Sequence, residues 1–257
     1  MRYTHTYRML LILLLIVVLL LLNLLLGSVS IPAQSIWNIL MGTGNEPVSW
    51  QNIVWKSRLP QALTALAAGA GLAVSGLQMQ TVFRNPLAGP SVLGISSGAS
   101  MGVAFVILLS GSLGGVALSR LGVMGEIALS VAAIIGSLSV MALIVYVSQK
   151  VKGNVTLLII GVMIGYVSNA VIGVLKFFSV EEDIRAYVIW GLGSFSRVSG
   201  NQMMLFVTLM AILLPLSFLL IKTLNLMLLG DGYARNLGLN IKRARLLVIV
   251  SAGVLTA

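Results

Sequence analysis

The sequence predicts an all-α polytopic membrane protein. Of its 257 residues, 58% are hydrophobic and only 9% are charged, whereas about 25% of the residues in ordinary soluble domains carry a charge. Stretches without any charged residue recur at 59–83, 127–149, 153–175 and 198–221. Each is long enough for the roughly 20 helical residues that cross the hydrocarbon layer of a bilayer. Because they lack a polar face, they are typical of transmembrane helices rather than of core helices in a soluble protein.

The first apolar run, 9–26, also predicts a transmembrane span. Arg2 and Arg8 precede it, which is a feature of signal peptides too. The hydrophobic part of a signal peptide is however shorter, about 7–15 residues, and ends in a small-residue cleavage site. Here mostly leucine continues up to Gly27, so we interpret the run as the first span.

Hydropathy and turn residues together predict six complete spans and the start of a seventh. The complete spans lie near 9–26, 61–82, 93–110, 126–148, 155–176 and 202–221. The seventh begins at about Leu246 and would be cut off at Ala257, so we expect the protein to continue by several spans. Small residues at four-residue spacing, as in Gly94, Gly98 and Gly102, predict close helix packing.

The distribution of positive charge favours a cytoplasmic N-terminus. The net charge is +10, and Lys and Arg are retained on the cytoplasmic side during insertion, so this charge does not indicate nucleic-acid binding. With the N-terminus inside, the cytoplasmic basic residues are Arg2, Arg8, Arg84, Lys150, Lys152, Lys222, Arg235, Lys242, Arg243 and Arg245. The basic residues outside are fewer: Lys56, Arg58, Arg120, Lys176, Arg185 and Arg197.

Residues for enzyme chemistry are missing from the predicted spans. The one histidine, His5, lies before the first span, so Ser96 and Ser97 have no histidine base to activate them. Cysteine is absent, and no span has the clustered His, Cys or carboxylate side chains of a metal centre. A GxxxxGK[ST] loop is absent too. The sequence therefore predicts no catalytic residue, no metal and no cofactor, and ATP hydrolysis would need a separate subunit.

One polar candidate for function is the turn that follows the second span, Arg84-Asn85-Pro86. Pro86 prevents the helix from continuing and pushes the residue before it into extended geometry. A rigid turn of this kind at a membrane surface can take part in function or be a plain connector.

A second polar candidate is the segment 228–245. Gly230 and Gly238 bracket a short polar helix with Asp231 near its N-terminus, which is a favourable place for a negative charge. Such a helix between two spans suits docking into a cleft of a soluble partner. The alternative is an interfacial loop that lipid headgroups anchor.

At these two segments the chain resembles the permease subunits of ATP-driven importers for iron-siderophores, haem and cobalamin, the FecCD type. The resemblance runs from about Trp55 to Ala257. Its motifs are RLPQ at 58–61, GAGLAVSGLQMQ at 69–80, RNPLAGPSVLGISSGA at 84–99 and GDGYARNLGLNIKRAR at 230–245, with a weaker match in IWGLGSF at 189–195. It implies a type II ABC importer permease with ten spans, of which about six and a half are present in a single permease domain over 1–257. It also implies a homodimer with the substrate path at its interface.

The resemblance further implies roles for particular residues. The segment 226–242 matches the cytoplasmic coupling helix that fits a groove of the ATP-binding subunit, with the residues Gly230, Asp231, Ala234, Arg235, Leu237 and Gly238. Lys56 and Arg58 match outer basic residues that meet acidic residues of a substrate-binding protein, although Gln61 stands where a second arginine is common. The inner gate corresponds to Asn154, Val155 and Thr156.

These features predict the permease subunit of a binding-protein-dependent ABC importer in the bacterial cytoplasmic membrane. The expected partners are two copies of an ATP-binding subunit, a periplasmic or lipid-anchored substrate-binding protein, a second permease subunit and membrane lipid, with no nucleic acid. An ion-coupled secondary transporter would bury ionisable residues within its spans, and here only Glu126 and Lys176 lie at span boundaries. A scaffolding membrane protein would need no coupling helix. The sequence does not choose among siderophore, haem and cobalamin.

Overall fold

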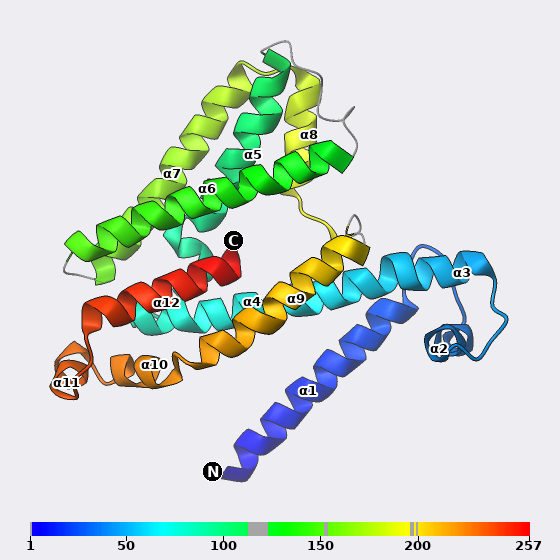
Figure 1. Ribbon diagram of the computed structural model, residues 1–257, viewed down its shortest axis with the longest axis horizontal. Coiled ribbons are helices and arrows are strands. Elements are labelled where there is room, and N and C mark those ends of the chain that lie inside the picture. Colours follow the sequence, from blue (N-terminus) through cyan, green and yellow to red (C-terminus); the bar gives the residue numbers. More distant parts are fainter. Residues whose placement is uncertain (1, 113–122, 152–153, 196–197, 199) are drawn as a thin grey trace. The chain divides into compact units, whose positions relative to one another are not determined.

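The computed structural model describes residues 2–112, 123–151, 154–195, 198 and 200–257 (Figure 1). All regular elements within these ranges are helical, which confirms the predicted all-α class. The chain divides into two compact units, the first made of Met1–Gly69 and Ser194–Ala211, the second of Ala70–Gly193 and Ile212–Ala257. That the whole chain is one permease domain stays a prediction.

The first unit is built around the N-terminal helix and two short helices that hydropathy does not reveal. Its elements are α1 (Arg2–Leu25), α2 (Ala33–Met41), α3 (Val48–Ile53), the π-helical turn η1 (Val54–Arg58) and the first parts of α4 (Leu59–Phe83) and α9 (Gly200–Phe218). Pro32 and Pro47 immediately precede α2 and α3, where the fixed backbone angle of proline suits a helix start. Ile36, Ile39 and Val54 form the centre of a small core.

The second unit contains most of the apolar helices. Its elements are the remainders of α4 and α9, the short 3-10 helix η2 (Pro90–Leu93), α5 (Ile95–Ser112), α6 (Val123–Lys150), α7 (Asn154–Phe177), α8 (Glu181–Gly191), α10 (Ile221–Leu228), α11 (Asp231–Asn236) and α12 (Ile241–Thr256). In Figure 1, α12 runs beside the second part of α4, in agreement with the hydrogen bond from the Ser75 hydroxyl to the Ala252 carbonyl. Met79, Val248 and Ile249 are part of the core between them.

Glycines bring the backbones of α5 and α6 into contact. A Cβ added to Gly102 would lie 2.2 Å from the carbonyl oxygen of Ala132, and one added to Gly136 would lie 2.2 Å from that of Gly98. Real Cβ contacts are never this short, so both positions need glycine. In lipid, where apolar burial does not drive helices together, such close approach allows them to associate. The packing predicted from the glycine spacing is confirmed for this pair.

Five helical stretches are long and apolar enough to cross a membrane, within the part of the chain that the structure describes. They are Thr6–Leu25, Val48–Phe83, Ile127–Lys150, Val155–Phe177 and Gly200–Phe218. The span predicted at 93–110 is a shorter apolar helix, Ile95–Leu109. The chain is therefore a multi-pass membrane protein, as its composition predicts.

The seventh apolar helix begins earlier than predicted. We expected its start near Leu246, after the basic residues, but α12 begins at Ile241. The side chain of Asn240 accepts a hydrogen bond from the backbone N–H of Arg243 at 3.2 Å, and this N-cap satisfies a donor that the first helical turn leaves free. Hydropathy missed this start because the first turns of α12 are basic, and Arg245 consequently lies inside the helix.

The predicted sixth span, 202–221, is also corrected at its end. The helix α9 stops at Phe218 and α10 begins at Ile221 after a short turn. A continuous run of apolar residues across this turn hid the break from a hydropathy pattern.

Candidate coupling site

The helix α11 is set off from its neighbours by two glycines with positive φ. Gly230 has φ 108° and Gly238 has φ 86°, and both conformations are open to glycine but costly for a residue with a Cβ. Between them, Asp231–Asn236 forms a helix of six residues. The prediction of a short polar helix between these two glycines is confirmed.

One side of α11 is seated on the protein and the other faces outward. Ala234 is fully buried, and its carbonyl accepts a hydrogen bond from Leu239 N at 2.9 Å. On the outer side, Tyr233 is 72% exposed and Leu237 is 62% exposed, and Arg235 is exposed between them. A membrane protein that exposes an aromatic ring, an aliphatic side chain and a cation on a helix this short offers a compact contact surface.

The predicted turn after α4 is present and is closed by its own hydrogen bonds. Arg84 has φ 48°, the one positive φ of a non-glycine residue among the residues described. The N–H of Asn85 donates to the carbonyl of Gln80 at 3.1 Å, which ends the helix in a left-handed C-cap. The side chain of Asn85 then accepts from Leu87 N at 2.9 Å. The turn thus holds Arg84 in one orientation, in a backbone conformation that costs arginine roughly 1–2 kcal/mol.

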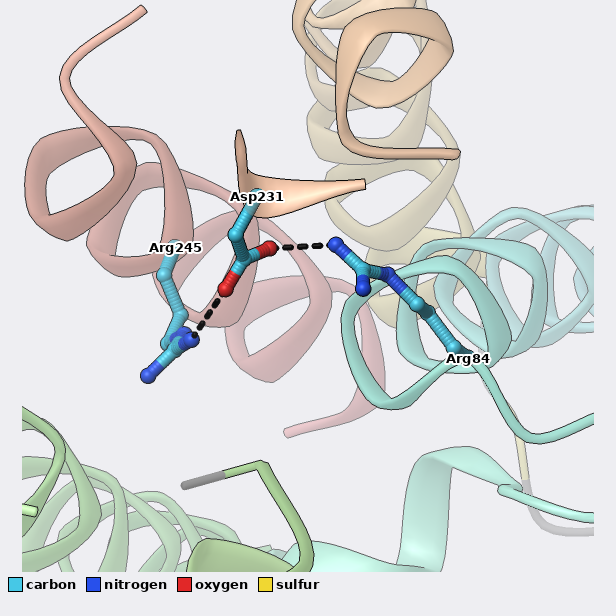
Figure 2. Close-up of polar contacts among 3 residues, drawn as sticks. All are labelled: Arg84, Asp231 and Arg245. Carbon is cyan, nitrogen blue, oxygen red and sulfur yellow. Dashed lines mark hydrogen bonds and ion pairs between the residues drawn. The ribbon is translucent and has the colours of Figure 1, made fainter. Parts of the chain in front are cut away.

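Asp231 links α11 to both of its neighbours in the second unit. Its Oδ1 accepts a hydrogen bond from Nη2 of Arg84, and its Oδ2 lies 3.6 Å from Nη2 of Arg245 (Figure 2). The side chains of Arg84 and Asp231 are each 40% exposed, whereas that of Arg245 is only 9% exposed. One carboxylate therefore joins the turn after α4, the start of α11 and the first part of α12.

Sequence reasoning found two members of this group and missed the third. Arg84 and Asp231 were expected in separate sites, and Arg245 was only counted among the basic residues. Its position in an apolar helix is a usable signal, because a buried arginine normally needs a paired charge. The pairing itself depends on the fold, since Arg84 and Asp231 are 147 residues apart.

Arg58, predicted to dock a binding protein, is buried within the first unit. Its guanidinium donates hydrogen bonds to the carbonyls of Leu24 at 2.7 Å and Leu25 at 3.0 Å, and also to that of Val29. Arg58 thereby satisfies carbonyls that the end of α1 leaves without a partner. Lys56, two residues earlier, is exposed. The docking role of both residues stays a prediction, and Lys56 is the one whose charge is accessible here.

The predicted gate residues lie at the start of α7. Asn154 is the first residue of that helix, and Val155 is 70% exposed. Thr156 is exposed as well. The side chain of Asn154 and residues 152–153 lie outside what the structure describes. The gate assignment stays a prediction.

The helix α8, which hydropathy missed, contains a buried carboxyl group. Asp183 is 8% exposed, and its Oδ2 has no hydrogen-bond partner in the structure. Burial raises the pKa of Asp183 above its ordinary value, and the neighbouring charge of Glu182 raises it further.

The ammonium of Lys176 on α7 lies 4.9 Å from the centre of the Tyr187 ring on α8. Among the described residues, no group of three or more His, Cys, Asp or Glu side chains is placed to hold a metal ion.

Comparison with known proteins identifies the relatives of this chain. The model of the FecCD transport family matches residues 14–257. The hemin transport system permease protein HmuU of Yersinia pestis is 33% identical over 232 residues, which cover 90% of this chain and 66% of that protein. The vitamin B12 import system permease protein BtuC of Serratia proteamaculans is 37% identical over 204 residues, covering 79% of this chain and 58% of that protein. The chain thus spans about three fifths to two thirds of the length of these relatives.

A solved structure has a similar fold. It is described as an inward-facing conformation of a metal-chelate type ABC transporter. Its TM-score is 0.76 at 30% sequence identity, and the match covers 95% of this chain and 71% of that chain.

Proposed function

Because this chain belongs to the FecCD transport family, we propose that it is the permease subunit of an ABC importer for a metal chelate, haem or cobalamin. The observation that supports this most strongly is α11, a short helix between two glycines whose outward side exposes Tyr233 and Leu237. A helix with this surface suits a groove in a separate ATP-binding subunit. The relatives, named for hemin and vitamin B12, suggest the class of cargo.

The proposed orientation puts the N-terminus and α11 on the cytoplasmic side of a bacterial inner membrane. The excess of Lys and Arg in the segments on that side supports it. The turn at Arg84 and the start of α7 at Asn154 then face the same side, where the gate is proposed. Two ATP-binding subunits and a second copy of the permease would complete the inner part of the transporter.

Transport in this proposal proceeds by alternating access. ATP brings the two ATP-binding subunits together, and the α11 helices seated in them move the spans between outward-open and inward-open states. Nucleotide and substrate each bias the two states only as far as they bind one of them more tightly. On the outer side, the exposed ammonium of Lys56 is proposed to meet an acidic residue of a substrate-binding protein.

Replacing Asp231–Leu237 by a flexible Gly/Ser linker of equal length tests the proposal. The full permease is produced together with its ATP-binding subunit and binding protein, and uptake of ferric siderophore, haem and cobalamin is measured. We expect uptake and co-purification of the ATP-binding subunit to be lost, while insertion into the membrane is retained. Lys222→Gln, which removes an exposed charge from α10, serves as the control and should transport normally. Uptake that survives the linker would show that α11 is not the coupling helix.

A further inference from the structure

Asp231 occupies a junction of three elements of the second unit: the turn after α4, the start of α11 and the first part of α12 (Figure 2). We infer that Asp231 is a positioning residue that ties α11 to α4 and α12, so that these three helices move together during transport. The inference rests on the proposed role of α11 as the coupling helix. It adds the contacts through which the motion of that helix reaches the spans.

The ion pair with Arg245 joins a buried arginine to a carboxylate that is 40% exposed. The side chain of Arg245 is 9% exposed, and its Nε has no hydrogen-bond partner. The Asp231 carboxylate is the acidic group found within ion-pair distance of it among the described residues. Removing the Asp231 carboxylate would leave the buried guanidinium of Arg245 without a compensating charge, which costs more than the loss of a pair between two exposed groups. Asp231 therefore stabilises the buried position of the Arg245 side chain on α12.

The arm that runs to Arg84 starts from an unusual backbone. A left-handed residue that follows a helix is normally glycine or asparagine, but the residue that follows α4 is Arg84, with φ 48°. Glycine would relieve the strain at this position, and it would also remove the guanidinium that binds Asp231. Strained residues of this kind are retained where the surrounding contacts over-determine them, often at functional sites.

The helices at the two ends of this junction are themselves bonded deep in the second unit. The hydroxyl of Ser75 donates to the carbonyl of Ala252 at 2.9 Å, and it lies 2.7 Å from the side-chain hydroxyl of Thr256. The amide of Gln78 donates to the hydroxyl of Ser251 at 3.1 Å. Ser75 and Gln78 are almost fully buried. Because α4 and α12 are joined at Ser75 and Gln78 and again through Asp231, a displacement of α11 is passed to both helices at once.

Most exposed ion pairs contribute little, so the environment of this one is decisive. Three charges from three elements form a network, and one of the two cations is buried. In such a network the members act together, and the loss of any one of them should have much the same effect as the loss of two. This non-additivity distinguishes a linkage from three independent surface charges.

The test compares charge-neutral variants in the complete transporter, reconstituted with its ATP-binding subunit and binding protein in liposomes. Uptake and ATP hydrolysis are measured on the same preparation, and the readout is substrate transported per ATP hydrolysed. We expect Asp231→Asn and Arg84→Gln each to lower this ratio about fivefold, while the ATP-binding subunit still co-purifies. The double variant should be no worse than Asp231→Asn alone. Asp231→Glu, which keeps the charge, should restore most of the ratio.

Arg243→Gln provides the matched control, because Arg243 lies on the same helix as Arg245 but is exposed. It should leave the ratio unchanged, whereas Arg245→Gln should lower it as Asp231→Asn does. A normal ratio in Asp231→Asn, or additive losses in the double variant, would overturn the inference. Loss of the ATP-binding subunit from Asp231→Asn would also overturn it, by assigning Asp231 to the docking surface. These failures leave the proposed function standing, since that is decided by the linker replacement of α11.

Discussion

The guanidinium of Arg58 donates a hydrogen bond to the carbonyl of Leu24 at 2.7 Å, across 34 residues of sequence. Arg58 is 5% exposed, and it also binds the carbonyls of Leu25 and Val29. The first helix thus ends on the side chain of the last residue of η1. Glycine at position 27 leaves room for this guanidinium, because a Cβ there would lie 2.8 Å from its Nη2.

Arg58→Gln should destabilise the permease by about 2 kcal/mol, because carbonyls at the end of α1 lose a charged donor. Thermal unfolding of the protein in detergent measures this loss. Lys56→Gln is the control, since Lys56 is exposed. It should leave the unfolding temperature unchanged but weaken the docking of the substrate-binding protein. A variant at Arg58 with normal stability and lost docking would instead support the role that the family resemblance implies.

Gly102→Ala should destabilise the protein by roughly 1–3 kcal/mol through overpacking. The new methyl group would lie 2.2 Å from the Ala132 carbonyl, and neither backbone can withdraw without separating α5 from α6. Gly173→Ala in α7 is the matched control, because a Cβ there meets nothing within 4 Å. Unfolding midpoints in detergent compare the two variants. Equal midpoints would contradict the close packing of the two helices.

Gly230→Ala should disturb the entry into α11 at a cost of about 1–3 kcal/mol, because φ 108° is a conformation for glycine. The expected result is weaker co-purification of the ATP-binding subunit, measured by quantitative pull-down from membranes. Gly232→Ala is its control within the same helix, where a Cβ meets nothing within 4 Å, and alanine favours the helix. If both variants retain the subunit equally, the positive φ of Gly230 has no part in presenting α11.

Asp183→Asn should stabilise the protein at neutral pH. Burial first and Glu182 second raise the pKa of Asp183 in the folded state above its ordinary value of 3.8. A raised pKa means that the folded state binds the proton more tightly than the unfolded state. The resulting contribution to the free energy of unfolding is complete below pH 3.8 and is lost as the pH rises through the folded pKa. The advantage of the asparagine variant should therefore shrink as the pH falls.

Unfolding temperatures at several pH values measure this difference. Glu181→Gln, at an exposed position on the same helix, should show no comparable gain. An advantage of Asp183→Asn that is independent of pH would assign the effect to packing rather than to the buried charge.

The spans could be predicted because their signal is local and long. A run of apolar residues of bilayer length is a helix wherever the rest of the chain goes, since every backbone group in lipid must be satisfied internally. The helices α2, α8 and α10 were not predicted, for the opposite reason. They are short and of mixed polarity, and their stability comes from the core on which they pack, as with Ile36 of α2.

The sequence by itself determined the membrane class, the family and the short helix between Gly230 and Gly238, because apolar length, motif order and glycine positions are written along the chain. Only the tertiary structure decided where the arginines go. Arg58 lies against the end of α1, and Arg84 and Arg245 converge on Asp231. A charged side chain near a helix end has the same sequence signature whether it faces solvent, a partner or its own protein. Its partner is selected by which segments the fold brings within hydrogen-bond distance.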